Sequence, residues 1–416
     1  MHKLDNRGVK PKTFLVLAGG TYQLPLIRSL KKRGIHVTLF DGSEVAPGFL
    51  ESDDGQVLDI SDPALVLEAA KELNIIGLAS IVNEATVVSV AFSANHFKMP
   101  SISEETAHKC TNKILMRESF LNSKMLIPAF FEADSMHGVR RSLDKIGFPA
   151  IIKPVDSSGS RGVMRIDDLS SIESAAKFAI SESKLGYVIV ESFLDGPEFT
   201  VETFSENGEI VVLGFSQKKR VDFPACVSIE LQYFPYRQHP FGVQIVSAAI
   251  QAIHSVGLSR GPAHIELILT SKGPVVVEIA ARGGGFRIFP EILKEISGVD
   301  VIDLVIDQSL GIPCAINPTK EKAAVLRFLN PEARGIVLGV SGIELAKKIP
   351  SVKDVVLEET VIGSIYSGIN KDGDRPGYIL TVAETIEDAL KAADSAEKSI
   401  IFDISKSITV EKNEFL

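Results

Sequence analysis

The chain has 416 residues, too many for one ordinary hydrophobic core, so we expect roughly two to three domains. Its 45% hydrophobic and 23% charged residues are typical of a soluble globular protein. The net charge of −9 argues against binding to nucleic acid or to anionic membranes. Residues 1–12 are polar, and no apolar run reaches membrane-spanning length, so a cytoplasmic protein is expected.

The first hundred residues alternate between expected strands and expected helices. This rhythm predicts an α/β domain with a parallel sheet and helices on both faces. The expected strands are 13–18, 35–40 and 76–82, and the expected helices are 22–33 and 62–73.

The turn Gly19-Gly20, with Asp41 about twenty residues later, raises the question of a dinucleotide site. The turn lacks the three-glycine spacing that brings a pyrophosphate to a helix N-terminus, so NAD binding is disfavoured. A small-molecule contact is still expected here, because ligands favour the carboxyl ends of parallel strands.

The rest of the chain changes character after Gly147, where an α+β region is expected. A helix is expected before it, over 104–125, closed by Ile127-Pro128. Further strands are expected at 150–153, 162–166, 187–192 and 199–204, then a helix at 238–256. The tail from about residue 320 predicts strands at 323–328 and 378–383 and a helix at 386–398.

Lys153 ends a buried strand, and a loop rich in serine and glycine follows it. Many backbone N–H groups, small side chains and nearby positive charge suit a polyphosphate. An ordinary polar hairpin loop is an equally good alternative from this segment alone. The candidate loop residues are Ser157, Ser158, Gly159, Ser160, Arg161 and Gly162.

Residues 188–202 form an expected strand, a Gly-Pro turn and a second expected strand. Glu191 ends the first apolar run, and Glu198 opens the next. An apolar slot with backbone hydrogen-bonding groups suits a purine, and one carboxylate acceptor suits a ribose diol. The alternative is an amphipathic strand pair with two solvated glutamates.

The segments 263–270 and 275–280 are two apolar runs joined by a glycine-containing turn, which predicts a hairpin. Each run carries one carboxylate, Glu266 or Glu278, and Arg282 with glycines 283–285 follows. A hard divalent cation is the usual compensation for carboxylates in an apolar setting. The segment therefore suits Mg²⁺ with a polyphosphate, and a surface hairpin with solvated glutamates is the alternative.

Two further residues have open interpretations. Lys113 lies near a helix start, and a lone surface lysine is its default interpretation. His264 shares the strand face of Glu266, so it is a candidate to orient that carboxylate or contact substrate; a core histidine is as good an alternative.

The order Lys113, Lys153 with its loop, Glu191 to Glu198, and Glu266 with Glu278 and Arg282 resembles the ATP-grasp superfamily of carboxylate–amine ligases. The resemblance covers about residues 103–312. It implies an α/β N-terminal domain over 1–105, an α+β ATP-grasp domain over 106–315 and a small α+β C-terminal lid over 316–416.

The resemblance also implies roles for the candidate residues. Lys113 and Lys153 would contact the ATP phosphates, with 157–162 as a mobile loop over them. Glu191, with backbone near Phe193 and Leu194, would hold adenine, and Glu198 the ribose. Glu266 and Glu278 would hold Mg²⁺, and Arg282 would stabilise an acyl-phosphate.

One departure concerns Ala280, where many members of the superfamily carry an asparagine metal ligand. The Glu-Ile-Ala-x-Arg version followed by glycines resembles the L-amino-acid ligase branch. The implied activity is an ATP- and Mg²⁺-dependent, ADP-forming ligation of a small-molecule carboxylate, with an amino acid favoured as one substrate, to an amine.

Two alternatives stay open: a purine-pathway or carboxylase-type enzyme, and a catalytically silent nucleotide-binding protein. Specificity is expected in loops such as 222–236. Assembly as a homodimer is an open alternative.

Overall fold

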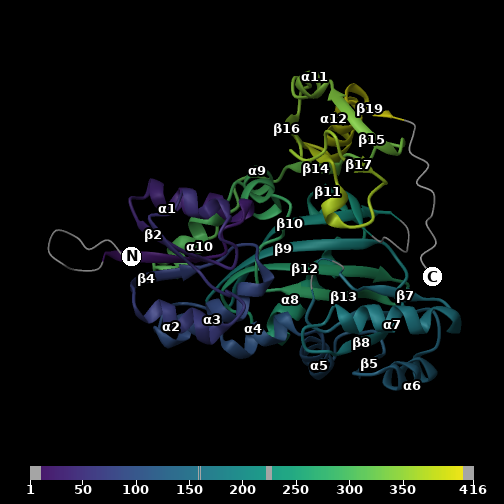
Figure 1. The fold of residues 1–416 in the computed structure, drawn as a ribbon, viewed down its shortest axis with the longest axis horizontal. Coiled ribbons are helices and arrows are strands. Elements are labelled where there is room, and N and C mark those ends of the chain that lie inside the picture. Colours follow the sequence, from purple (N-terminus) through teal and green to yellow (C-terminus); the bar gives the residue numbers. More distant parts are fainter. Residues whose placement is uncertain (1–10, 158, 160, 222–226, 406–416) are drawn as a thin grey trace. The chain divides into compact units, whose positions relative to one another are not determined.

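The structure is a computed structural model that describes residues 11–157, 159, 161–221 and 227–405. The chain divides into two compact units (Figure 1). The first comprises Met1–Phe215 and Tyr236–Glu321, and the second comprises Ser216–Pro235 and Lys322–Leu416. The expected boundaries at residues 105 and 315 stay a prediction. In the described parts of the chain, no helix combines the length and apolar character needed to cross a bilayer.

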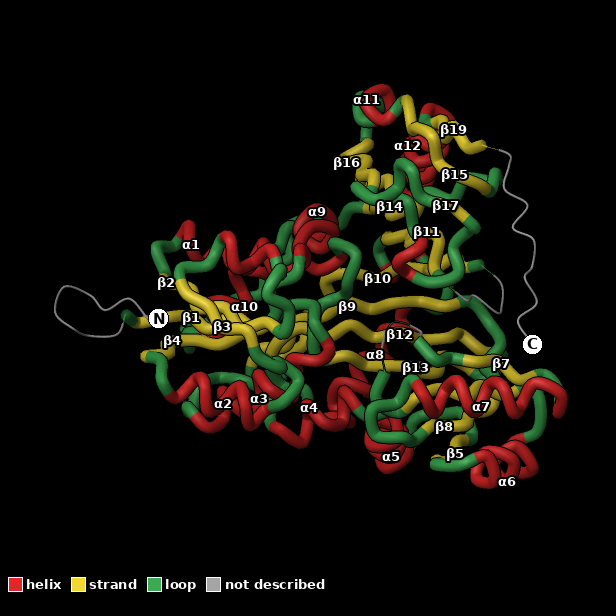
Figure 2. The backbone as a smooth tube through the Cα atoms, in the orientation of Figure 1, coloured by secondary structure: helices red, strands yellow, loops and turns green. Residues whose placement is uncertain are grey.

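The first unit begins with a four-stranded sheet whose strands all run parallel, as expected. The sheet order is β3-β2-β1-β4. The tube in Figure 2 shows helix α1 on one side of this sheet and helices α2 and α3 on the other. The elements are β1 (Lys12–Leu17), α1 (Leu24–Lys32), β2 (His36–Asp41), β3 (Asp54–Val57), α2 (Pro63–Lys71), β4 (Asn74–Ala79) and α3 (Val87–His96).

The single helix expected over 104–125 is wrong, because two helices occupy this segment. They are α4 (Glu104–Thr111) and α5 (Lys113–Asn122). Asn112 between them has extended backbone, and its side chain accepts hydrogen bonds from Ile114 N and Leu115 N. Asparagine is among the best helix N-caps, so it restarts the helix and makes Lys113 its first residue.

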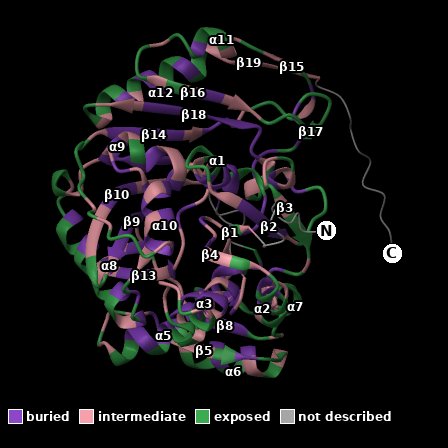
Figure 3. Ribbon diagram, turned by 90° about the vertical axis from the view of Figure 1, so that its left-hand side faces the viewer, coloured by how far each residue is buried: buried purple, intermediate pink, exposed green. Residues whose placement is uncertain are grey.

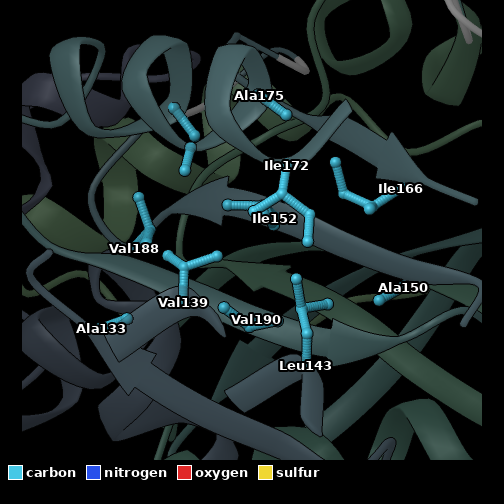
Figure 4. Close-up of a cluster of buried hydrophobic side chains, with 12 residues drawn as sticks. Ala133, Val139, Leu143, Ala150, Ile152, Ile166, Ile172, Ala175, Val188 and Val190 are labelled. Atoms are coloured by element: carbon cyan, nitrogen blue, oxygen red, sulfur yellow. The ribbon is translucent and has the colours of Figure 1, made fainter. Parts of the chain in front are cut away.

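A second four-stranded sheet follows, with the order β5-β8-β6-β7 and antiparallel pairing. Its core consists of alternating strand residues packed against two helices, as the labelled side chains Val139, Leu143, Ile152, Ile172 and Val190 show (Figure 4). The elements are β5 (Phe130–Ala133), α6 (Met136–Ile146), β6 (Ala150–Pro154), β7 (Met164–Ile166), α7 (Ile172–Ser181) and β8 (Val188–Ser192).

The third sheet of this unit contains the expected hairpin. Strand β12 (Gly261–Thr270) pairs antiparallel with β13 (Gly273–Ala280) on one side and with β9 (Glu198–Glu206) on the other. Helix α8 (Gly242–Val256) packs against β13 and β12. It starts later than the expected residue 238, because a short 3₁₀ turn over Tyr236–Gln238 precedes it. Helices α9 (Leu293–Ser297) and α10 (Val301–Ser309) follow the hairpin.

The second unit is built on antiparallel strands that are largely buried at β14 and β18 (Figure 3). The end of β10 (Glu209–Arg220) pairs with β11, β11 with β14, β14 with β18, and β18 with β16. A separate small sheet has the order β17-β15-β19. The elements are β11 (Ser228–Tyr233), β14 (Ala323–Phe328), β15 (Gly335–Ser341), α11 (Ile343–Ala346), β16 (Val352–Leu357), β17 (Ile365–Tyr366), β18 (Gly377–Ala383), α12 (Ile386–Ser399) and β19 (Ile401–Ser405).

Candidate active site

Two carboxylates face each other on the β12–β13 hairpin. Glu266 and Glu278 are register partners, and a shift in pairing follows Glu266. Their side chains are 27% and 22% exposed, so both remain accessible to a ligand. Like charges directly opposite each other on a sheet are destabilising, and a cation between them removes that cost. Ala280 is fully buried and supplies no donor.

Oxygen ligands of this kind suit Mg²⁺, which commonly binds one or two carboxylates and keeps other positions for water and phosphate oxygens. Within the described residues, no cluster of three or more acidic, histidine or cysteine side chains is arranged to hold a metal. Glu266 and Glu278 therefore fit the partial ligand set of a metal that is shared with a polyphosphate, and their role stays a prediction.

Lys113 is buried at the start of α5, so its interpretation as a surface lysine is wrong. Its Nζ donates to Ser157 O at 2.5 Å and lies 3.3 Å from Glu278 Oε1. One ammonium thus connects the serine–glycine loop with the carboxylate pair. From the sequence, only the family resemblance indicates that the serine–glycine loop and the hairpin lie close together. In the structure, Lys113 contacts both segments.

Lys153 belongs to a buried cluster with Glu191 and Arg117. Lys153 Nζ donates to Glu191 Oε2 at 2.7 Å, and Arg117 Nε donates to Glu191 Oε1 at 2.6 Å. Burial alone would raise the pKa of Glu191, but the two cations lower it to about 2. Burial lowers the pKa of Lys153, and Glu191 opposes that shift. The alternative of a solvated Glu191 is wrong, since the residue is buried.

The serine–glycine loop starts from this cluster. Gly159 and Gly162 have φ values of 66° and 72°, which an L side chain rarely adopts. A Cβ on Gly162 would come within 2.7 Å of Pro154 Cγ, so this position requires glycine. Arg161 is exposed. Ser158 and Ser160 lie outside the described residues.

The expected adenine segment lies between β8 and β9. Phe193 N donates to Pro149 O at 3.1 Å, and the Arg165 guanidinium lies over the Phe193 ring at 4.3 Å from its centroid. Leu194 is half-buried, and Glu198 begins β9 half-buried. These positions place an aromatic, an aliphatic and a carboxylate side chain along one turn, and their contact with a nucleoside stays a prediction.

Arg282 is joined to Glu84, a residue that the sequence analysis missed. Arg282 Nε donates to Glu84 Oε2 at 2.6 Å, and Nη1 donates to its neighbour Gly283 O at 3.0 Å. Burial would lower the pKa of Arg282, but Glu84, Glu278 and Glu266 raise it above its ordinary value.

The glycines after Arg282 allow close packing beneath the loop. Gly283 N donates to Ile81 O at 2.8 Å, and a Cβ on Gly283 would come within 2.1 Å of Phe289 Cγ. The Arg282 loop is therefore fixed to the edge of the N-terminal sheet, where β4 ends.

His264 lies between two carboxylates on the same sheet. Its Nδ1 is 2.6 Å from Glu202 Oε1, and its Nε2 is 3.3 Å from Glu266 Oε1. Burial alone would lower the pKa of His264, but the two carboxylates raise it to about 9. The contact with Glu266 agrees with a histidine that orients this carboxylate. Glu202 had no sequence signal beyond its place in a strand.

These contacts include three pairs of opposite charge, and Arg117 shares the glutamate of the second pair. The pairs are Lys113 with Glu278, Lys153 with Glu191, and Arg282 with Glu84. They come from α5, β6, β8, the hairpin and the segment after β4. The arrangement can hold an anion with several charges, neutralise negative charge that develops on it, and present carboxylates to a metal.

Comparison with known families agrees with this geometry. Residues 146–289 match the ATP-grasp domain, and residues 327–405 match the L-amino acid ligase C-terminal domain 2. The chain is 28% identical over 230 residues to dapdiamide A synthase of Enterobacter agglomerans, covering 54% of this chain and 51% of that protein. It is 24% identical over 347 residues to a phosphoribosylamine–glycine ligase of Methanocaldococcus jannaschii, covering 74% of each.

Solved structures show the same fold. An L-amino acid ligase from Bacillus licheniformis aligns with a TM-score of 0.80 at 24% identity, covering 95% of this chain and all of the other. A phosphoribosylglycinamide synthetase from Anaerococcus prevotii aligns with a TM-score of 0.72 at 20% identity, again over 95% of this chain. The chain therefore contains an ATP-grasp domain and the C-terminal domain of the L-amino acid ligases, and its homologues include named ligases.

Proposed function

We propose that this protein is an ADP-forming ligase that uses ATP and Mg²⁺ to join an amino acid to an amine through an acyl-phosphate. The observation that carries the proposal is the contact of Lys113 with both Ser157 and Glu278. It brings a phosphate-type loop and a pair of facing carboxylates to one ammonium group. Such a site suits the terminal phosphates of a nucleotide.

In the first step, an oxygen of the substrate carboxylate attacks the γ-phosphorus, and the bond to ADP breaks. Lys113 and Lys153 would neutralise charge on the phosphoryl oxygens. Glu266 and Glu278 would hold Mg²⁺, which would supply further charge neutralisation. Nothing in this step requires the α-phosphate, so ADP is the expected product.

In the second step, the amine nitrogen attacks the acyl carbon, phosphate leaves, and the nitrogen loses a proton. Arg282 would stabilise the negative charge that develops on the acyl oxygen. Its Nη1 also donates to Gly283 O, which fixes the direction of the guanidinium.

The Arg282–Glu84 pair supports an amino acid as a substrate. An α-amino acid carries a carboxylate and an ammonium on one carbon, and a guanidinium beside a carboxylate is complementary to that arrangement. The chain's relatives include dapdiamide A synthase and an L-arginine-specific L-amino acid ligase of Bacillus subtilis, whose names agree with this substrate class.

A purine-pathway reaction is the alternative, because relatives named phosphoribosylamine–glycine ligase are also similar to this chain. Such a substrate carries a phosphate. The carboxyl edge of the N-terminal sheet instead presents Asp41 and Glu84. Asp41 already accepts hydrogen bonds from Gly19 N at 2.6 Å and Ser43 N at 2.7 Å. Arg282 offsets the charge of Glu84, so Asp41 supplies the repulsion that a phosphate would meet at this edge, which favours the amino acid.

The test combines the purified chain with ATP, Mg²⁺ and pools of amino acids, and measures phosphate and nucleotide products. We expect ADP and phosphate in equal amounts, with an amide product. With the acyl substrate but no amine, hydroxylamine should trap an acyl hydroxamate. AMP and pyrophosphate as stoichiometric products would overturn the acyl-phosphate mechanism. ATP binding without phosphate release in any amino-acid pool would favour the silent nucleotide-binding protein.

A further inference from the structure

The cluster of Arg117, Lys153 and Glu191 contains two cations and one anion, so it has a net charge of +1. Arg117 is fully buried, and Lys153 and Glu191 are 5% and 4% exposed. The nearby Lys113 does not alter this balance, because Glu278 pairs with it. An uncompensated charge in a buried site is costly, so an excess cation here indicates an anionic ligand rather than a contribution to stability.

Arg117 also reaches the hairpin. Its Nη2 donates to Val277 O at 2.8 Å, and Val277 directly precedes Glu278. Arg117 lies four positions after Lys113 on α5, so both side chains project from one helix face. Its third nitrogen, Nη1, is buried and has no hydrogen-bond partner among the described residues.

The sharing of Glu191 has an electrostatic consequence for Lys153. A carboxylate that pairs with one ammonium alone neutralises it. Here Arg117 occupies the second oxygen of Glu191, so a positive excess remains close to Lys153. The guanidinium cannot release its proton, so the positive charge that Arg117 contributes persists at any working pH.

We propose that Arg117 is a positioning residue for the nucleotide: it holds Glu191 and the β13 backbone, and it maintains the positive excess that makes Lys153 available to the phosphates. The proposal rests on the proposed function only in that the bound anion is ATP. Arg117 acts through Glu191 and Lys153 and does not itself touch the nucleotide.

The test measures binding of ATP and of ADP directly, by calorimetry without amine or amino acid, to four variants. Arg117→Met keeps an apolar stem and makes the cluster neutral. Arg117→Lys keeps the charge. Glu191→Gln raises the net charge to +2. The double variant Arg117→Met with Glu191→Gln returns it to +1.

We expect Arg117→Met to weaken ATP binding on the order of 10- to 100-fold, because a unit charge a few ångströms away is removed from a site of low dielectric. Arg117→Lys should recover most of the affinity. The double variant should bind ATP more tightly than Arg117→Met alone, which a purely structural role for Arg117 does not produce.

Two results would overturn the proposal: unchanged ATP affinity in Arg117→Met, or a double variant that binds ATP no more tightly than Arg117→Met. Thermal unfolding establishes whether each variant folds. If Arg117→Met does not fold, the ATP affinities of Arg117→Lys and the double variant are compared with that of wild type to decide whether Arg117 acts through its charge. Nucleotide binding is measured without the ligation reaction. If the ATP affinities of the variants rank as expected but the wild-type protein forms no amide, the proposed function is refuted and this inference stands.

Discussion

Glu84 and Arg282 are 198 positions apart in the chain, and a hydrogen bond of 2.6 Å joins them. Glu84 begins a 3₁₀ turn after β4, and Arg282 follows β13. The pair fixes the loop after the carboxylate hairpin to the edge of the N-terminal sheet, together with the hydrogen bond from Gly283 N to Ile81 O. The residue that would act on the acyl group and the carboxylate that holds it therefore come from the ends of two separate sheets.

Arg282→Ala should lower the rate of the chemical step more than it lowers the affinity for ATP. A donor aimed at developing charge typically contributes on the order of 100- to 1000-fold in rate. Single-turnover rates and ATP dissociation constants would be measured for both proteins. Arg282→Lys keeps the positive charge, so its single-turnover rate should fall less than that of Arg282→Ala. A variant with wild-type turnover and only weaker ATP binding would remove Arg282 from the acyl-transfer step.

Glu278→Gln should abolish turnover while the fold stays intact. The substitution keeps the size of the side chain and removes one charged oxygen of the facing pair, which weakens the hold on Mg²⁺. Turnover would be measured across a Mg²⁺ titration, with melting temperature as the folding readout. Glu359→Gln, an exposed carboxylate elsewhere in the chain, is the matched control. Wild-type ADP release at saturating Mg²⁺ would show that the metal assignment is wrong.

Gly283→Ala should destabilise the protein, whereas Gly285→Ala should be tolerated. A Cβ at 283 would come within 2.1 Å of Phe289 Cγ, and Phe289 is buried, but a Cβ at 285 meets no atom within 4 Å. Overpacking a core in this way costs about 1 to 3 kcal/mol. Chemical unfolding of the two variants provides the measurement. Equal stability would contradict the packing that we describe beneath the Arg282 loop.

Glu230→Gln should remove part of the acid sensitivity of the second unit. Burial would raise the pKa of Glu230, but Lys219, Gln232 and Arg327 lower it below its ordinary value. Since the folded pKa lies below the unfolded one, the stability that this group contributes is present above the ordinary glutamate pKa. That stability is lost as pH falls through the folded value.

At pH 7 the Glu230→Gln variant should therefore be less stable by roughly 1 to 3 kcal/mol, the usual contribution of hydrogen bonds to a charged group. The difference in stability between wild type and the variant should disappear as the pH falls. Melting temperatures of both proteins from pH 7 to pH 3 would check this. A gap that stays constant across the range would mean that Glu230 is not charged in the folded state.

Local sequence patterns predict the hairpin that carries Glu266 and Glu278, because two apolar runs joined by a glycine-containing turn are a short-range signal. The same holds for the parallel N-terminal sheet. The restart of the helix at Asn112 is not evident from the sequence, since an apolar pattern continues across it and only the cap residue marks the break.

The partners of the candidate residues could not be predicted in the same way. Arg117 contacts Glu191 and Val277, which lie 74 and 160 positions away. Its sequence signal is only its spacing of four residues from Lys113. Glu84 and Glu202 likewise sit in ordinary polar positions, and the tertiary fold alone selects them from the other glutamates as partners of Arg282 and His264.

The path of the chain has a consequence for synthesis on the ribosome. Segment 216–235, which contains β11, belongs to the second unit. Residues 236–321 of the first unit are synthesised after it and before β14, the strand that pairs with β11. At usual translation rates, β11 waits on the order of 5 to 20 seconds with one edge unpaired. An unpaired edge invites pairing with another chain, and an inward-facing charge is a common protection. Glu230 supplies that charge on β11 until Arg327, its register partner, arrives to neutralise it.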